Sequence, residues 1–454
     1  MSRFLIAAAH KSSGKTVIST GLAAAFHARG ATVQCFKKGP DYIDPMWLTA
    51  ASHRPCYNLD FNTMTPDEMA VLLCTKSEDA DLTMIEANKG LFDGVDIDGS
   101  DSNAELAKNL KTPVILVIDT TGTTRGIAPL LLGYQVFDKD IQIAGVILNK
   151  VGGSRHESKL RAAVETYTDI PVLGAVGNNP ALDIGERHLG LTTPAETGQL
   201  DATIRGFGEI VGASVDLDAI QGIADTTPDL CPPPVPSPMA IHSGLRIGIA
   251  QDASFGFYYP DDLQAFEALG ATLVPFDTMS APKLPDIDGL LIGGGFPEMQ
   301  MAALAKNAPL MADIKHAIEA GLPTYAECGG LMYLCRSLKW GDDNYPMCNV
   351  VPGDAIMCEH PQGRGYTVFQ TLPEHPWERQ FEQLPAHEFH YARIDNLPKD
   401  LIFARQILRG HGTDGQNDGI VIHNLLAGFC HMRNTSQNPW VSQFLDFVKK
   451  NRQP

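Results

Sequence analysis

Short apolar runs that alternate with helical stretches constrain this fold more than any other feature of the sequence. Residues 113–118 (PVILVI) and 143–148 (IAGVIL) are uninterrupted apolar runs, as expected of strands buried on both faces. Further strands are expected at residues 4–7, 32–36 and 82–86, and a helix at 17–29. Strands that alternate with helices predict a parallel, doubly wound sheet in an α/β fold.

A proline-rich stretch divides the chain of 454 residues. Residues 226–239 read TTPDLCPPPVPSPM, a composition typical of an extended connector. Beyond it the α/β pattern resumes, with strands expected from 245 and at 272–275, 289–292 and 323–326, and helices at 260–268 and 311–320. We therefore expect two domains, 1–225 and 244–454, joined by a linker at 226–243.

A glycine-bearing loop follows the first strand. Residues 9–16 read AHKSSGKT, and Gly14, Lys15 and Thr16 form the ending of a phosphate-binding loop. Glycine allows the backbone N–H groups to face phosphate, lysine reaches the terminal phosphates, and threonine offers its hydroxyl to Mg²⁺. Ala9 stands where the usual pattern has glycine. The loop predicts ATP as co-substrate, with Mg²⁺.

Lys11 adds a second lysine to this loop. The spacing Lys-x-x-Gly-Lys-Thr resembles the deviant loop of the dimeric ATPases that include dethiobiotin synthetase and the nitrogenase iron protein. That resemblance implies a dethiobiotin synthetase-like domain, a homodimer, and a role for Lys11 in neutralising phosphate charge.

Acidic residues follow two other expected strands. Asp41 and Asp44 come after Lys37, and Glu86 ends the strand at 82–86. Ligands of doubly wound sheets collect at the carboxyl ends of the strands, and carboxylate oxygens suit Mg²⁺. A single aspartate there is more often a turn or helix cap, but the combination indicates a site. Lys37 is expected to neutralise charge on a phosphoryl group in transfer.

Several long motifs resemble the cobyrinic acid a,c-diamide synthase family. They are VQCFKKGPDYIDPMWLTAASHRPCYNLD at 33–60, EANKGLFDG at 86–94, IAGVILNKVGGSRH at 143–156 and ERHLGL at 186–191. The resemblance extends over nearly the whole chain. It implies a ligase that uses ATP and glutamine to amidate two acetate side chains of an acidic tetrapyrrole.

The resemblance also implies residue roles in the first domain. Asp41, Asp44 and Glu86 would serve Mg²⁺-ATP and the phosphorylated intermediate. Asp93 would lie near the tetrapyrrole, and Asn149 would contact the adenine. Phosphoryl transfer to a carboxylate makes an acyl phosphate, which has a good leaving group for attack by ammonia.

A nucleophile turn is expected in the second domain. Residues 323–330 read PTYAECGG and place Cys328 between a buried strand and a helix, the cysteine counterpart of the serine elbow. A helix N-terminus favours the thiolate. Residues 293–298 read GGGFPE, and N–H groups at Gly294 and Gly329 are expected to form an oxyanion hole.

His431 is the expected base, and His423 is the alternative. His431 matches the histidine of class I glutamine amidotransferases, which implies the pair Cys328 and His431 for glutamine hydrolysis. That class has a glutamate two residues after the histidine, and here Arg433 stands there, as in the cobyric and cobyrinic acid subgroup. Residues 387–391 (HEFHY) lack the spacing of a zinc motif and are interpreted as substrate pocket or domain contact.

Three acidic tetrapyrroles fit the resemblance: cobyrinic acid, nickel-sirohydrochlorin and sirohaem. The form of the loop AHKSSGKT, Lys38 and the pair Met46 and Trp47 resemble homologues associated with dissimilatory sulfite reductase, which favours a sirohaem amidase. The alternatives are a P-loop ATPase of the partitioning or metal-insertion type without amidation, a ligase that takes free ammonia, and a cobyric acid synthase.

Bulk composition narrows the partners further. The net charge of -18 disfavours nucleic acid, and no apolar run reaches the ~18 residues of a membrane span. The nine cysteines show no metal-type pair, which fits a reduced cytoplasmic setting.

Overall fold

The computed structural model describes residues 1–454 except 186–189, 231, 233–241, 378, 380 and 453–454. The chain forms two compact units, Met1–Val235 and Pro236–Pro454. The division falls within the predicted linker, most of which lies outside the described residues, as do residues 186–189 of the ERHLGL motif. In the part that is described, no helix is long and apolar enough to cross a bilayer.

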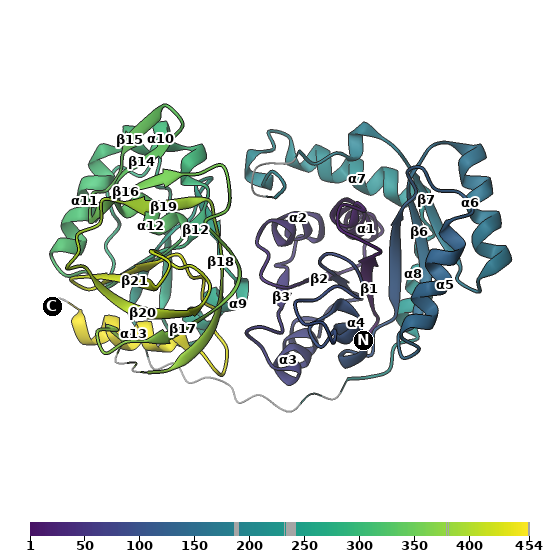
Figure 1. Cartoon of the computed structure of the whole chain (residues 1–454), viewed down its shortest axis with the longest axis horizontal. Helices are drawn as coiled ribbons and strands as arrows, with labels where there is room; N and C mark the ends of the chain where they lie inside the picture. Colours follow the sequence, from purple (N-terminus) through teal and green to yellow (C-terminus); the bar gives the residue numbers. More distant parts are fainter. Residues whose placement is uncertain (186–189, 231, 233–241, 378, 380, 453–454) are drawn as a thin grey trace. The chain divides into compact units, whose positions relative to one another are not determined.

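A parallel sheet forms the centre of the first unit. Its seven strands, counted over the described residues, run in the order β3-β2-β4-β1-β5-β6-β7, and every pairing is parallel (Figure 1). The strands are β1 (Arg3–Ala8), β2 (Val33–Lys38), β3 (Tyr57–Leu59), β4 (Leu82–Glu86), β5 (Val114–Asp119), β6 (Ile143–Val151) and β7 (Val172–Gly177). This confirms the predicted α/β class, while β3 and β7 were not predicted.

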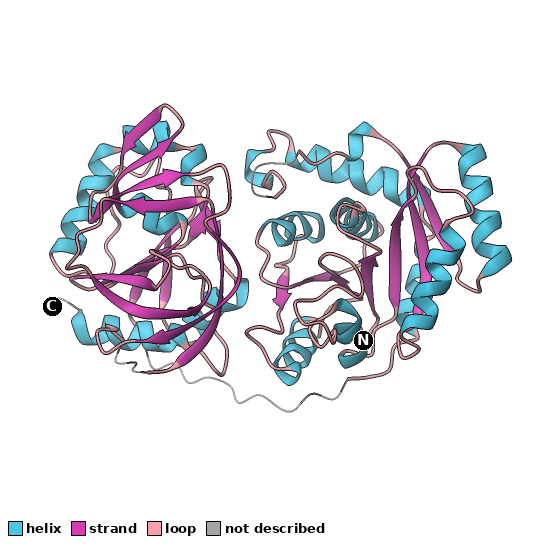
Figure 2. Ribbon diagram, viewed as in Figure 1, coloured by secondary structure: helices cyan, strands magenta, loops and turns pink. Residues whose placement is uncertain are grey.

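Helices cover both faces of this sheet (Figure 2). They are α1 (Lys15–Ala28), α2 (Ile43–Ser52), α3 (Pro66–Lys76), α4 (Asn103–Asn109), α5 (Ile127–Phe137), α6 (Ser154–Tyr167), α7 (Leu200–Ser214) and α8 (Leu217–Asp225), with short 3₁₀ turns at Pro180–Leu182 and Pro194–Glu196. Alternate residues of each strand point to opposite faces, so Leu5 and Ala7 share one core with Leu73 of α3 and Leu131 of α5.

Strand register brings the predicted site together. Ile6 of β1 and Lys37 of β2 both stand opposite Glu86 of β4, because β4 lies between the other two strands. The loop at 9–16 follows β1 directly. The carboxyl ends of three neighbouring strands therefore carry the loop, a lysine and a glutamate at one edge of the sheet.

The second unit has a mixed sheet. Its order is β10-β8-β11-β13-β22-β21-β20-β17-β18; the pairings from β10 to β22 are parallel and the others antiparallel. The strands are β8 (Arg246–Ala250), β10 (Thr272–Phe276), β11 (Gly289–Ile292), β13 (Thr324–Glu327), β17 (Gly363–Thr371), β18 (Gln383–His390), β20 (Ile402–Arg409), β21 (Asn417–Ile422) and β22 (Leu425–Gly428).

Smaller sheets and helices complete this unit. A two-stranded antiparallel sheet pairs β9 (Phe255–Phe257) with β12 (Gly294–Gly295), and another sheet has the order β15-β14-β16-β19. The remaining elements are β14 (Cys335–Trp340), β15 (Asp343–Pro346), β16 (Val351–Met357), β19 (Ala392–Asp395), α9 (Pro260–Ala268), a 3₁₀ turn at Pro297–Met299, α10 (Met301–Lys306), α11 (Ala308–Glu319), α12 (Gly329–Leu334) and α13 (Trp440–Asn451). None of the strands between residues 327 and 422 was predicted from the sequence.

Candidate active sites

The phosphate loop has the backbone that its sequence predicts. Gly14 is the N-cap of α1 with a φ of 85°, in the left-handed region that glycine adopts without strain. A Cβ on Gly14 would lie 2.3 Å from Nδ2 of Asn149, so a larger residue has no room. The Nζ of Lys15 donates to the carbonyl oxygen of Lys89 at 2.6 Å. This hydrogen bond joins the loop to the segment that follows β4.

The end of β6 supports the loop from its other side. Nδ2 of Asn149 donates to the carbonyl oxygen of Ser13 at 2.9 Å. Nζ of Lys150 lies 3.3 Å from the carbonyl oxygen of Ser12 and 2.9 Å from the Asp119 carboxylate. Asn149 thus holds the loop backbone in place, and its contact with adenine stays a prediction.

A buried charge cluster lies beside the loop. Nζ of Lys37 is 2.5 Å from Oδ2 of Asp44 and 2.7 Å from Oε1 of Glu86. The hydroxyl of Thr16 donates to the same Glu86 oxygen at 3.1 Å. Asp44 lies in the first turn of α2, where a carboxylate also complements the helix dipole. Four of the predicted residues are therefore in contact with one another.

Burial and charge act against each other in this cluster. Burial lowers the pKa of Lys37, but Asp44 and Glu86 together raise it well above its usual value. Burial, and then the charge of Lys37, lower the pKa of Lys15 to about 8. Burial, and then the charge of Asp44, raise the pKa of Asp41 to about 7. Oδ1 of Asp41 accepts from two backbone N–H groups at the start of α2.

The side-chain oxygens of this cluster could supply some, but not all, of the ligands of a bound Mg²⁺. Oε2 of Glu86 is buried and has no hydrogen-bond partner in the described part of the chain, and the Thr16 hydroxyl lies beside the other oxygen. Among the described residues, no three His, Cys, Asp or Glu side chains are placed to hold a metal ion by themselves. Mg²⁺ commonly binds through one or two carboxylates together with phosphate and water oxygens.

Two predicted residues lie at the surface of this edge. Lys11 is exposed in the loop. Asp93 is also exposed, and its Oδ2 accepts from the N–H of Gly90 at 2.9 Å. Neither side chain is part of the buried charge cluster. Both are exposed, as expected of residues that contact a molecule bound from solvent.

Cys328 has the strained backbone of a nucleophile turn. It follows β13 and is the N-cap of α12, with φ 49° and ψ −102°. A non-glycine residue at positive φ is costly, and such strain concentrates at functional sites. Its N–H donates to the carbonyl oxygen of Gly428 at 2.8 Å. A Cβ on Gly330 would lie 2.2 Å from the carbonyl oxygen of Ile292, so the turn requires glycine there.

His431 is held against this turn. It follows β22 and exchanges backbone hydrogen bonds with His387 of β18, whose ring stacks on it at 4.8 Å between centroids. Burial lowers the pKa of His431, but contacts with Cys328 and Glu327 raise it to about 10. His423, the alternative base, lies in an exposed turn between β21 and β22.

The glycine loop at 293–295 borders the same place. A Cβ on Gly294 would lie 2.6 Å from Cε1 of His431. A Cβ on Gly329 would lie 3.1 Å from the backbone nitrogen of Gly295. The two predicted oxyanion-hole segments therefore lie side by side, next to the predicted base.

Sequence reasoning missed two residues at this site. Glu327 directly precedes Cys328, and its Oε2 lies 3.4 Å from Nδ1 of His431. His387 was assigned to a substrate pocket or domain contact, and the structure stacks it on His431. A carboxylate at the buried end of the nucleophile strand is a signal that could have identified Glu327, since an isolated buried charge is unfavourable.

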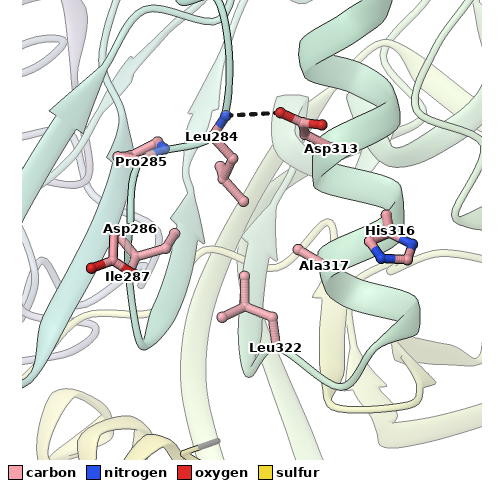
Figure 3. Close-up of a pocket in the computed structure, with 8 residues that line it drawn as sticks. All are labelled: Leu284, Pro285, Asp286, Ile287, Asp313, His316, Ala317 and Leu322. Carbon is pink, nitrogen blue, oxygen red and sulfur yellow. Dashed lines mark hydrogen bonds between the residues drawn. The ribbon is translucent and has the colours of Figure 1, made fainter.

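A cavity of about 290 Å³ lies elsewhere in the second unit. Its lining includes Leu284, His316 and Asp313, whose carboxylate accepts from the N–H of Leu284 at 3.3 Å (Figure 3). None of its lining residues is a predicted site residue, so neither candidate site is formed by this cavity.

Comparison with known proteins identifies both units. Residues 246–439 match a CobB/CobQ-like glutamine amidotransferase domain, and residues 2–184 match an AAA domain. The cobyrinate a,c-diamide synthase of Magnetococcus marinus is 41% identical over 444 residues, which covers 96% of this chain and 95% of that protein. The chain belongs to the cobyrinate a,c-diamide synthase family.

Other members of the cobyrinate a,c-diamide synthase family match over similar lengths. The enzyme of Methanosarcina acetivorans is 37% identical over 99% of this chain and 96% of that protein. The enzyme of Listeria monocytogenes serotype 4b is 40% identical over 95% of this chain and 96% of that protein. The family resemblance predicted from the motifs is confirmed, and the chain is a glutamine-dependent amidoligase with an ATP-using domain.

Proposed function

We propose that this chain uses ATP and glutamine to convert two acetate carboxylates of an acidic tetrapyrrole into amides, with cobyrinate as the acceptor. One observation carries the proposal. A phosphate loop with a buried Lys37–Asp44–Glu86 cluster and a Cys328 nucleophile turn occur in one chain, and its relatives are named for this activity.

The first unit would activate the acceptor. A carboxylate oxygen attacks the γ-phosphorus of ATP and ADP leaves, which gives an acyl phosphate. Lys15 and Lys37 neutralise charge on the phosphoryl oxygens during transfer. Thr16, Asp44 and Glu86 would hold Mg²⁺, which neutralises phosphate charge when bound. Ammonia then attacks the acyl carbon, phosphate leaves, and the amide forms.

The second unit would supply the ammonia. Sγ of Cys328 attacks the amide carbon of glutamine, while His431 accepts the thiol proton and passes it to the departing ammonia. The backbone N–H groups of Gly294 and Gly329 would stabilise the oxyanion. Water then hydrolyses the thioester to glutamate and restores the thiol. The contacts of His431 with the turn support this assignment.

Sirohaem is the second candidate acceptor. The loop AHKSSGKT, Lys38 and the pair Met46 and Trp47 favour it, whereas the names of the relatives favour cobyrinate. Asp93 is exposed beside the phosphate loop and would face the acceptor in either case.

The sequence of the loop also supports a homodimer, which analytical ultracentrifugation would test.

Product mass distinguishes these acceptors. The full chain would be incubated with MgATP, glutamine and each of cobyrinic acid, sirohaem and nickel-sirohydrochlorin. Each carboxylate converted to an amide lowers the mass by about one unit, because NH₂ replaces OH. Two such steps with cobyrinic acid are expected, and conversion of sirohaem alone would overturn the proposed acceptor. Hydrolysis of ATP without hydrolysis of glutamine and without any amide product would favour the P-loop ATPase without amidation.

A further inference from the structure

Strand pairing places one carboxylate beside the catalytic histidine. Side chains at alternate positions of a strand point to the same face, so Glu327 and Tyr325 share one face of β13. In the parallel pairing with β22, Glu327 stands opposite Gly428. The chain continues for three residues beyond Gly428 to His431. Glu327 is therefore next to the segment that carries His431, although the two residues are distant in sequence.

The Glu327 carboxylate is anchored through its other oxygen. Oε1 accepts from the hydroxyl of Tyr325 at 2.5 Å and from the N–H of Met432 at 2.9 Å. Oε2 lies 3.4 Å from Nδ1 of His431. The residue is buried, with 7% of its surface exposed, so its position is set by these contacts and not by solvent. The anchoring leaves one oxygen directed at the histidine ring.

The position where class I amidotransferases have glutamate does not supply this contact. Arg433 is two residues after His431, and its guanidinium is 2.6 Å from Asp261. It also lies over the ring of Tyr259, at 4.1 Å from the centroid. Arg433 is thus engaged with α9 and the residue before it, and Glu327 approaches His431 from β13.

We propose that Glu327 is the positioning residue of the glutaminase, which orients His431 through Nδ1 so that Nε2 serves Cys328. The inference rests on the proposed glutamine hydrolysis. A carboxylate on one ring nitrogen fixes the tautomer and ring orientation and stabilises the imidazolium that forms when the thiol proton is accepted. The third member of the triad therefore comes from the residue before the nucleophile.

The surroundings of His431 explain why this carboxylate matters. Cys328 and Glu327 both favour the protonated imidazole, whereas burial disfavours it. His387 stacks on the other side, and burial, then His431 and Arg433, lower the pKa of His387 well below its usual value. His387 is therefore a neutral neighbour. Removing the charge of Glu327 would lower the pKa of His431 and loosen the orientation of its ring.

The test uses Glu327→Gln in the full chain, with glutamine hydrolysis measured from pH 5 to 10. We expect kcat for glutamine to fall by about 10²- to 10⁴-fold, as when a triad carboxylate is neutralised. The pH dependence of Cys328 alkylation by iodoacetamide should move to higher pH, because the imidazolium of His431, which stabilises the Cys328 thiolate, is lost earlier. Amidation driven by added ammonia should be unchanged, and Glu327→Asp should recover part of the glutamine-driven rate.

A matched control separates positioning from general destabilisation. Asp262 is another buried carboxylate of the second unit, and it accepts hydrogen bonds from Asn434 and Trp440. Asp262→Asn should lower the melting temperature without moving the alkylation profile. A Glu327→Gln variant with the wild-type rate and alkylation profile would overturn the inference. Wild-type protein without any glutaminase activity would instead overturn the proposed function.

Discussion

Both candidate sites follow the same local plan, a parallel strand, a glycine-bearing turn and a helix, yet they are stabilised differently. In the phosphate loop the positive φ angles belong to Ser12 and Gly14, and the charged side chains of Lys37 and Glu86 pair with each other. In the nucleophile turn, the predicted nucleophile Cys328 itself has the positive φ. Charge pairing stabilises the first site, whereas close packing holds the strained backbone of the second site in place.

The two sites also differ in how far apart their parts lie in the sequence. The charge cluster is built from residues within 16–86, on neighbouring strands of one parallel sheet. The glutaminase joins β13 to residues beyond β22 and to β18 of the antiparallel ladder. Local motifs therefore define the first site, whereas long-range strand pairing completes the second.

Cys328→Ala should have the largest effect and should affect only one site. Glutamine-driven amidation is expected to fall by at least about 1,000-fold, because no other group supplies the thiolate. Amidation with ammonium chloride should persist, since the ATP-using unit is intact. Product formation with each nitrogen source would be compared by mass, and unchanged glutamine-driven activity would show that Cys328 is not the nucleophile.

Lys15→Ala should produce the opposite pattern. Loss of a cation on the phosphates is expected to lower amidation by about 100- to 1,000-fold with either nitrogen source. Glutamine hydrolysis to glutamate should be lowered far less. Phosphate release and glutamate release, followed in the same reaction, give the two rates. An equal loss of both would mean that the sites are coupled and the comparison fails.

Gly330→Ala tests how tightly the nucleophile turn is packed. The new Cβ would meet the carbonyl oxygen of Ile292 at 2.2 Å, so we expect about 1–3 kcal/mol of destabilisation. Gly206→Ala in α7 is the matched control, because nothing lies within 4 Å of its added Cβ. The control should be neutral or slightly stabilising. Urea unfolding curves of both variants measure the difference, and equal curves would contradict the packing argument.

Asp41→Asn should have the smallest effect, visible in the pH dependence of stability. The pKa of Asp41 is raised from 3.8 to about 7, so the folded chain holds this proton more tightly than the unfolded chain. The stability that results is complete below the unfolded pKa and is lost as pH rises through the folded pKa. Asparagine keeps an oxygen for the two N–H groups at the start of α2 but cannot titrate.

Melting temperatures from pH 4 to 8 would test this linkage. Between pH 4 and 7, wild-type stability should decline relative to the Asp41→Asn variant, and the difference between the two should level off above the folded pKa. A constant difference across the range would show that Asp41 does not titrate within the folded cluster.

The sequence sufficed for features whose parts are adjacent in the chain. The loop at 9–16 was predicted because glycine, lysine and threonine have defined roles at the start of a helix. The strand that ends at Glu86 was predicted from its short apolar, β-branched run. The antiparallel strands were missed. In β17 (GRGYTVFQT), for example, several buried positions carry polar residues or glycine. The alternation of apolar and polar residues that indicates a strand is therefore weak.

The sequence could single out Glu327 as a buried carboxylate, but it could not predict the contact of Glu327 with His431, for a related reason. It depends on the register that sets Glu327 opposite Gly428, and register is a property of the paired strands. The position at which class I amidotransferases have a glutamate is occupied by Arg433, and its guanidinium forms an ion pair with Asp261.

The pairing of β13 with β22 also has a consequence during translation. The hydrogen bond from Met432 to Glu327 spans 105 residues of sequence. At about 5–20 residues per second, the ribosome adds the histidine segment roughly 5 to 20 seconds after the nucleophile strand. A nascent chain at that stage has Cys328 without His431, while the ATP-using unit is already synthesised. In the proposed mechanism, glutamine hydrolysis therefore begins only after the half of the enzyme that consumes ammonia has been made.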